Sequence, residues 1–197
     1  PGTLYLWENY TRGTALHVGT LNGNGTLALQ DHNVSSELIL GDFKGHSFTI
    51  QNGYLIRLTL NQAGSLILDD VTVENMPTVP AGMDLKVKDN VIFKNRVRFY
   101  GPANLTGGTF NAGLSYQDEQ GKDHPCLELL APGYAFAEDN GKIINPGSAS
   151  TLSRAQVVPH TCTYEDGKCD CGRICDHEGM IDSNTGLCKN CNLQVYR

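Results

Sequence analysis

Residues 47–68 read SFTIQNGYLIRLTLNQAGSLIL, and the nature of the fold is already visible in their pattern. Three short segments place large apolar side chains two residues apart, at Phe48-Thr-Ile50, Leu58-Thr-Leu60 and Leu66-Ile-Leu68. A turn signal, Ala63-Gly64, separates the last two. Apolar residues at a period of two are typical of strands, because alternate side chains of a strand point to the same face. The stretch therefore predicts short strands joined by tight turns.

The same pattern recurs through residues 1–116 in two alternating registers. The first register contains Leu16-His-Val18, Leu38-Ile-Leu40, Leu58-Thr-Leu60 and Leu85-Lys-Val87, at intervals of 22, 20 and 27 residues. The second contains Leu27-Ala-Leu29, Phe48-Thr-Ile50, Leu66-Ile-Leu68 and Val91-Ile-Phe93. Short strands that repeat about every twenty residues predict a solenoid, here a right-handed parallel β-helix. We expect the longer third interval to reflect Met76–Pro80, as a loop extruded from one coil.

A β-sandwich with a similar number of strands is the alternative fold, since regular turns also fit it. The constant order of the two registers favours the solenoid. We assign residues 1–116 to the solenoid body, residues 117–158 to a small C-terminal cap and linker, and residues 159–197 to a Cys/His tail.

The tail carries one pattern of histidine and cysteine twice. The first copy consists of His160, Cys162, Cys169 and Cys171, and the second of Cys175, His177, Cys188 and Cys191. Thiolate and imidazole are the ligands that Zn²⁺ takes in closed, tetrahedral structural sites. The tail is therefore predicted to be zinc-ribbon-like and to hold two structural zinc ions with no open coordination position.

Disulfides are the alternative chemistry for the tail, because six of the seven cysteines lie there and three disulfides would persist in an exported protein. Two features favour metal. Histidine cannot form a disulfide, and one residue between Cys169 and Cys171 would strain a bond between them. That spacing is also tighter than the usual Cys-x-x-Cys, so we expect the first zinc site to be the weaker one.

Composition restricts the partners. The net charge is -6 and the pI is about 5.4, which argues against nucleic acid and against an anionic membrane surface. No apolar run approaches the length of a membrane span, so membrane insertion is not expected. The chain begins at Pro1, and we expect it to be a fragment with neighbouring modules in a longer protein.

The order of segments resembles modules of large cell-surface proteins of Gram-positive bacteria. The resemblance rests on the β-helix coils, Gly107-Gly-Thr-Phe110, Leu129-Leu-Ala-Pro-Gly-Tyr-Ala-Phe136, Val157-Val158 and then His160 with paired cysteines. It implies a secreted protein, attached to the cell wall, whose modules act as adhesins or bind a host glycan or a host protein.

Aromatic side chains on the body are candidates for glycan binding, because sugars stack on aromatic faces. These candidates are Trp7, Tyr54 and Tyr100. A carbohydrate-active enzyme, such as a polysaccharide lyase or glycosidase, is the alternative function for a β-helix. Its candidate residues are Asp31, His32, Arg57, Asp69, Asp70, Arg96 and Arg98. No carboxylates are paired at a diagnostic spacing, so we expect a non-catalytic module.

Overall fold

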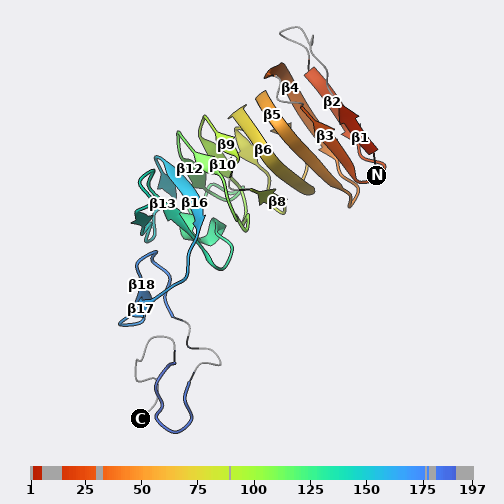
Figure 1. Cartoon of the computed structure of the whole chain (residues 1–197). Helices are drawn as coiled ribbons and strands as arrows, with labels where there is room; N and C mark the ends of the chain where they lie inside the picture. The colour runs from red at the N-terminus through yellow and green to blue at the C-terminus, as the bar shows by residue number, and fades with distance from the viewer. Residues whose placement is uncertain are drawn as a thin grey trace.

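The computed structural model describes residues 2–5, 15–29, 33–88, 90–175, 177 and 181–189. Strands make up 51% of it and helix 2%, and the chain forms a β-solenoid of about five turns (Figure 1). The solenoid prediction is thus confirmed and the β-sandwich is excluded. Trp7, Asp31, His32 and Cys191 lie outside the described residues. No helix in the described ranges is long and apolar enough to cross a membrane.

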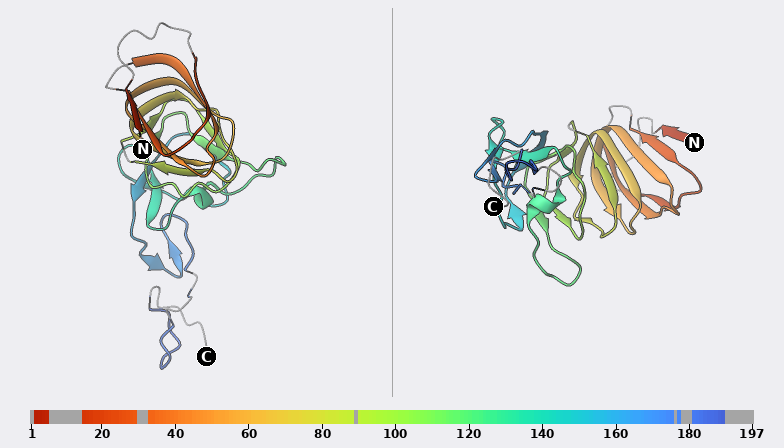
Figure 2. Two further views of the ribbon diagram at one scale, coloured as in Figure 1. Left: turned by 90° about the vertical axis from the view of Figure 1, so that its right-hand side faces the viewer. Right: turned by 90° about the horizontal axis from the view of Figure 1, so that it is seen from below.

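Twelve strands that pair in parallel lie in the described part of the solenoid body, and Figure 2 shows its coils stacked one behind another. They are β1 (Gly2–Tyr5), β2 (Ala15–Thr20), β3 (Gly25–Ala28), β4 (Asn33–Asp42), β5 (Ser47–Leu60), β6 (Ser65–Asn75), β7 (Thr78–Val79), β8 (Asp84–Val87), β9 (Ile92–Phe93), β10 (Val97–Phe99), β11 (Thr109–Phe110) and β12 (Leu114–Tyr116).

Each coil contributes to three columns of stacked strands. The first column holds β2, the second half of β4 and the end of β5, and further along the chain β7, β10 and β12. The second column holds β1, β3, and the first parts of β5 and β6, followed by β8. The third holds the start of β4, the middle of β5, the end of β6, β9 and β11. The sequence had suggested only two registers.

The third column changes two assignments made from the sequence. Leu85 pairs with Leu66, so Leu85-Lys-Val87 belongs to the second register and not to the first. Ile92-Phe93 stacks in the third column on Thr72-Val73. A pair of apolar residues has the same sequence pattern in all three columns. Only the positions of the bends decide which column the pair joins.

The expectation of an extruded loop at Met76–Pro80 is wrong. Thr78–Val79 forms β7 and pairs in parallel with β10, and Met76 and Val79 are both buried. This segment completes the first column of its coil. The sequence pattern showed an interval of 27 residues because it missed β7. This strand, the shortest of that column, carries one large apolar side chain instead of two.

Polar residues with left-handed backbone conformation form one set of corners. Asn52 (φ 59°) and Asp70 (φ 52°) lie at equivalent bends, because the flanking pairs Gln51–Asp69 and Gly53–Val71 are in register. Asn and Asp adopt this conformation more readily than other residues with a side chain. Asn52 and Asp70 therefore turn the chain from the second column into the third.

The core is a continuous stack of inward-pointing side chains. Leu38 and Leu58 are buried on successive coils, and the rings of Phe93 and Phe110 stack at a centroid distance of 4.7 Å. The outward positions between them are polar or partly exposed, as the alternation predicts. Burial of one such side chain contributes about 1.5–3 kcal/mol.

After β12 the pairing becomes antiparallel. The strands concerned are β13 (Tyr134–Ala137), β14 (Ile143–Ile144), β15 (Thr151–Leu152) and β16 (Ala155–Pro159), with a 3-10 helix, η1 (Cys126–Leu129), before them. β15 pairs with β12 and β16 with β11, so these strands cover the last coil of the solenoid. Without such a cover, the open edges of a parallel stack would offer unpaired N–H and C=O groups.

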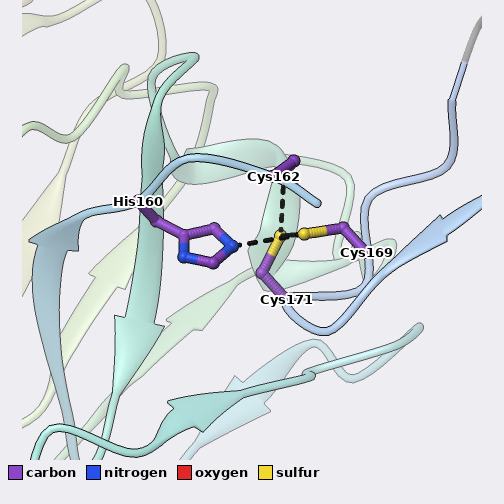
Figure 3. Close-up of side chains that lie close together, drawn as sticks. All are labelled: His160, Cys162, Cys169 and Cys171. Carbon is purple, nitrogen blue, oxygen red and sulfur yellow. Dashed lines mark hydrogen bonds between the residues drawn. The ribbon is translucent and has the colours of Figure 1, made fainter. Parts of the chain in front are cut away.

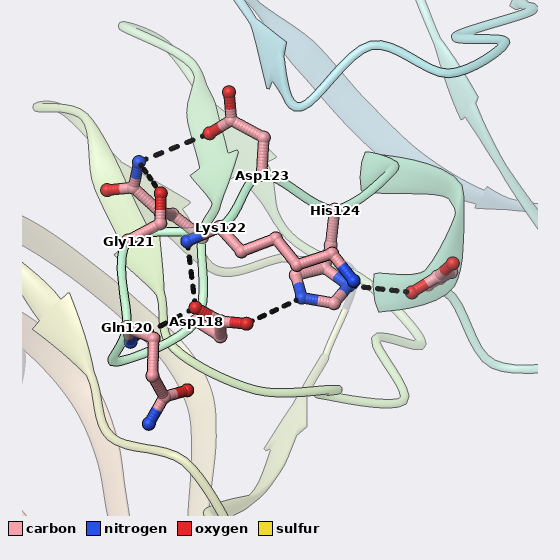
Figure 4. Close-up of polar contacts among 8 residues, drawn as sticks. Asp118, Gln120, Gly121, Lys122, Asp123 and His124 are labelled. Atoms are coloured by element: carbon pink, nitrogen blue, oxygen red, sulfur yellow. Dashed lines mark hydrogen bonds and ion pairs between the residues drawn. The ribbon is translucent and has the colours of Figure 1, made fainter.

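A polar loop of the cap is organised around the carboxylate of Asp118 (Figure 4). Asp118 accepts hydrogen bonds from the backbone N–H groups of Gln120 and Lys122 and lies 3.0 Å from Nε2 of His124. The other ring nitrogen of His124 faces Glu128 at 3.8 Å. His124 therefore binds carboxylates and does not face Cys126, which is a buried free thiol. Burial raises the pKa of Cys126 to about 11.

Candidate metal centre

The first His/Cys cluster is formed by a hairpin that leaves the cap. β16 leads directly to His160, whose backbone N–H donates to the carbonyl of Gly133. β17 (Tyr164–Glu165) and β18 (Lys168–Cys169) then pair in antiparallel. Asp166 (φ 49°) and Gly167 (φ 76°) form the two-residue turn, and positive φ at both positions is the turn that tight hairpins require. The hairpin brings the two halves of the first ligand pattern together.

Figure 3 shows the four side chains converging, and their donor atoms all lie within 4.8 Å of one another. Nε2 of His160 is 3.2 Å from Sγ of Cys169, Cys162 Sγ is 3.5 Å from Cys171 Sγ, and the sulfurs of Cys169 and Cys171 are 3.3 Å apart. Zn–S bonds of about 2.3 Å give tetrahedron edges of about 3.8 Å, whereas a disulfide requires about 2.0 Å. The cluster has nearly the size of a zinc tetrahedron.

The thiols are buried and receive backbone hydrogen bonds. Cys171 is fully buried and Cys169 is 3% exposed. Burial raises the pKa of both thiols, while the backbone N–H groups of Cys171 and Arg173 donate to the sulfurs of Cys169 and Cys171 and lower it. Amides directed at sulfur stabilise thiolate, and a bound cation would do so more strongly. Burial and the directed amides therefore act in opposite directions on the two thiols.

One edge of the first cluster is open to solvent. His160 and Cys169 line a hollow of about 410 Å³, together with the exposed carboxylate of Asp170. An oxygen of Asp170 is 3.0 Å from Nε2 of His160 and 3.1 Å from Sγ of Cys169. The pKa of Asp170 is lowered, first by a hydrogen bond from the thiol of Cys169 and further by His160. An anionic oxygen thus stands where an ion would enter.

The second cluster brings together three of its four predicted ligands. Donor atoms of Cys175, His177 and Cys188 all lie within 4.8 Å of one another, and the two sulfurs are 3.5 Å apart. Both cysteines are buried. The predicted fourth ligand, Cys191, lies outside the described residues. Among the cysteines that the structure describes, none forms a disulfide.

Two residues that attach the tail were missed in the sequence. The guanidinium of Arg173 donates through Nη2 to the carbonyls of Leu130, Ala131 and Tyr134, at 3.5, 2.8 and 3.4 Å. Tyr164 packs against the cysteines of both clusters. In the sequence, both residues lie in polar segments between the cysteines and histidines of the two patterns, and no periodicity distinguishes them.

The predicted glycan platforms are not brought together. The ring of Tyr54 lies under Nζ of Lys94 at 4.8 Å, and its hydroxyl donates to Glu74, which raises the pKa of Tyr54 to about 12. Tyr100 follows β10 in the first column, whereas Tyr54 lies in the third. Trp7 is not among the described residues.

The residues considered for an enzyme have local partners. Asp69 forms an ion pair with Lys88 at 3.0 Å, and Arg57 lies 3.9 Å from Glu37. Asp70 occupies a corner, as described above. Arg96 and Arg98 are exposed on either side of the buried Val97, so alternation does turn them to one face. Nε of Arg96 donates to a backbone carbonyl, that of Ala112.

A groove that the sequence did not indicate lies where the solenoid meets the cap. Its volume is about 590 Å³, and it follows the outward side of β8. Ile67, Ala131, Tyr134 and Pro159 give it apolar walls. Its polar lining residues are Asp84, Lys86, Lys88, Asn104 and Thr106. This volume and this mixture of surfaces are typical of small-ligand sites.

Comparison of the chain with known protein families, curated proteins and solved structures found no match.

Proposed function

We propose that this chain is a non-catalytic binding module of a bacterial cell-surface protein, with structural zinc in its tail. One observation carries the zinc assignment: four protein donors, three sulfurs and one imidazole nitrogen, converge within 4.8 Å in the first cluster. This donor set selects zinc among the common divalent ions, since calcium and magnesium prefer oxygen.

The structural role follows from the number of donors. A catalytic zinc keeps one position for water or substrate, whereas four protein donors fill a tetrahedron. The hairpin also has little apolar support, since Ala135 and Ile143 of the cap are the neighbours of its cysteines. A segment this small requires a metal or a covalent link to stay folded.

Elemental analysis of the purified chain tests this proposal. We expect about two zinc ions per chain, and a Cys169→Ser/Cys171→Ser variant should lose one of them. Cys126→Ser is the matched control, because Cys126 is equally buried but lies outside both clusters. Absence of zinc together with fully oxidised thiols would establish the disulfide alternative instead.

The groove along β8 is the part of the body that best fits a host glycan. Tyr134 offers an aromatic ring, Asn104 an amide and Asp84 a carboxylate, the groups that hold sugar rings and hydroxyls. We expect binding on a glycan array to fall in Tyr134→Ala and to persist in Tyr100→Ala. Loss of glycan binding in Tyr100→Ala alone would indicate that the ligand binds at the first column of strands. Absence of binding to every glycan on the array would favour a host protein as the ligand.

A further inference from the structure

Tyr164 stands between the two metal clusters. It belongs to β17 and pairs across the hairpin with Cys169. Its side chain packs against the group formed by Ala135, Cys169 and Cys171, and also against Cys175 and Cys188 of the second cluster. Burial raises the pKa of its phenol, and the neighbouring side chain of Cys162 raises it further. One side chain therefore contacts ligands of both sites.

The backbone connects the clusters along the same path. The N–H of Cys175 donates to the carbonyl of Gly167 at 2.8 Å, at the turn of the hairpin. The preceding residue, Ile174, forms an antiparallel bridge with Lys168. The first ligand of the second site is thus held by the hairpin that builds the first site.

The two sites differ in how they are attached to the body. The first is fixed to the cap through Ala135 and through Arg173, which reaches three carbonyls. Among the described contacts of Cys175, those with Gly167 and Tyr164 run through the hairpin. The hairpin that builds the first site is thus joined to the cap, and the same hairpin also holds Cys175 of the second site.

We propose that Tyr164 is a positioning residue shared by both metal sites, and that filling of the first site prepares the second. This inference rests on the proposed binding of zinc. An ordered hairpin places Cys175 and directs the ring of Tyr164 against Cys188, so the second ion finds part of its site already formed. Zinc therefore fills the first cluster before the second. The Cys-x-Cys spacing had instead predicted that the first site would be the weaker one.

Coupling between two binding sites is reciprocal, so zinc in the second site tightens the first by the same factor. Couplings between sites in proteins are typically about 5- to 150-fold. A tenfold effect in each direction is the expectation for one shared ring and one shared segment of backbone.

The test is a zinc titration of the full chain under reducing conditions, in competition with a chromophoric chelator. Cys169→Ser/Cys171→Ser leaves only the second site, and Cys175→Ser/Cys188→Ser leaves only the first. We expect the isolated second site to bind zinc at least tenfold more weakly than it does in the intact chain, where the first site is filled. Tyr164→Ala should make the sites independent.

Tyr164→Phe separates the packing of the ring from the effect of its hydroxyl. It keeps the ring between the clusters, so the coupling should remain. It removes the hydroxyl from Cys162, so with cobalt(II) in place of zinc the sulfur-to-metal charge-transfer band of the first site should shift. A merely structural role for the ring would leave that band unchanged.

The outcomes are distinct. If the second site alone binds zinc as tightly as in the intact chain, or if Tyr164→Ala leaves the coupling unchanged, the inference is wrong while zinc binding stands. If the intact chain takes up no zinc at all, the proposed function fails and the inference with it.

Discussion

The solenoid body and the Cys/His tail of this chain are stabilised in opposite ways. In the body, every coil buries large apolar side chains on those of the next coil, so many small contributions add up along the stack. In the described part of the tail, the buried side chains are mainly those of cysteines, with the partly buried Tyr164 packed against them. In the tail, the proposed bonds between metal and ligands take the place of an apolar core. A repeat can therefore tolerate local damage, whereas the proposed metal cluster depends on all of its ligands at once.

Removal of metal should separate the two regions most clearly. A strong chelator at neutral pH should unfold residues beyond His160, since a structural zinc contributes on the order of 10 kcal/mol to a small domain. The β-strand signal of the body should persist. Amide hydrogen exchange read by mass spectrometry checks this, and simultaneous loss of protection in β5 and β6 would contradict it.

Phe110→Ala should have the reverse effect. Phe110 is fully buried, stacks on Phe93 and contacts Phe99 edge to face at 6.2 Å. Its truncation should lower the free energy of unfolding of the body by about 3–5 kcal/mol. Zinc content should stay at the wild-type level. Chemical denaturation and elemental analysis of one preparation measure both, and Tyr100→Ala is the partly exposed aromatic control.

Arg173→Ala tests how the tail is attached to the cap. Hydrogen bonds from a charged group contribute about 1.5–3 kcal/mol, so the tail should detach more readily from the cap. We expect faster exchange at the amides of His160 and Cys169, with both metal sites still able to fill. Arg154→Ala removes an exposed ion pair with Asp139 and should change exchange little. Equal changes in amide exchange in the two variants would show that Arg173 does not attach the tail to the cap.

The smallest expected effect concerns the cap loop. The hydrogen bond with His124, followed by that from the amide of Lys122, lowers the pKa of Asp118 from its ordinary 3.8. The stabilisation is therefore complete above pH 3.8 and disappears as the pH falls through the lower, folded value. The NMR shift of the Lys122 amide proton should follow this titration, and the titration should be absent in Asp118→Asn.

Alternation and spacing were sufficient to predict strands, the solenoid and the first ligand set, because each of these is written in short-range patterns. The first-column strand β7 was missed because Val79 is its only large apolar residue and gives no alternation of its own. The groove along β8 was also missed, since its walls come from residues as distant as Ile67 and Pro159. Such a surface has no local signature.

By itself, the sequence determined the type of structure and the type of chemistry: period-two apolar residues require a strand, and paired cysteine and histidine offer soft ligands. Only the tertiary structure decided which strands share a column, that Tyr164 and Arg173 attach the tail, and where a groove opens. The physical reason is that these features depend on the directions in which the chain bends. Those directions bring together side chains that are far apart along the sequence.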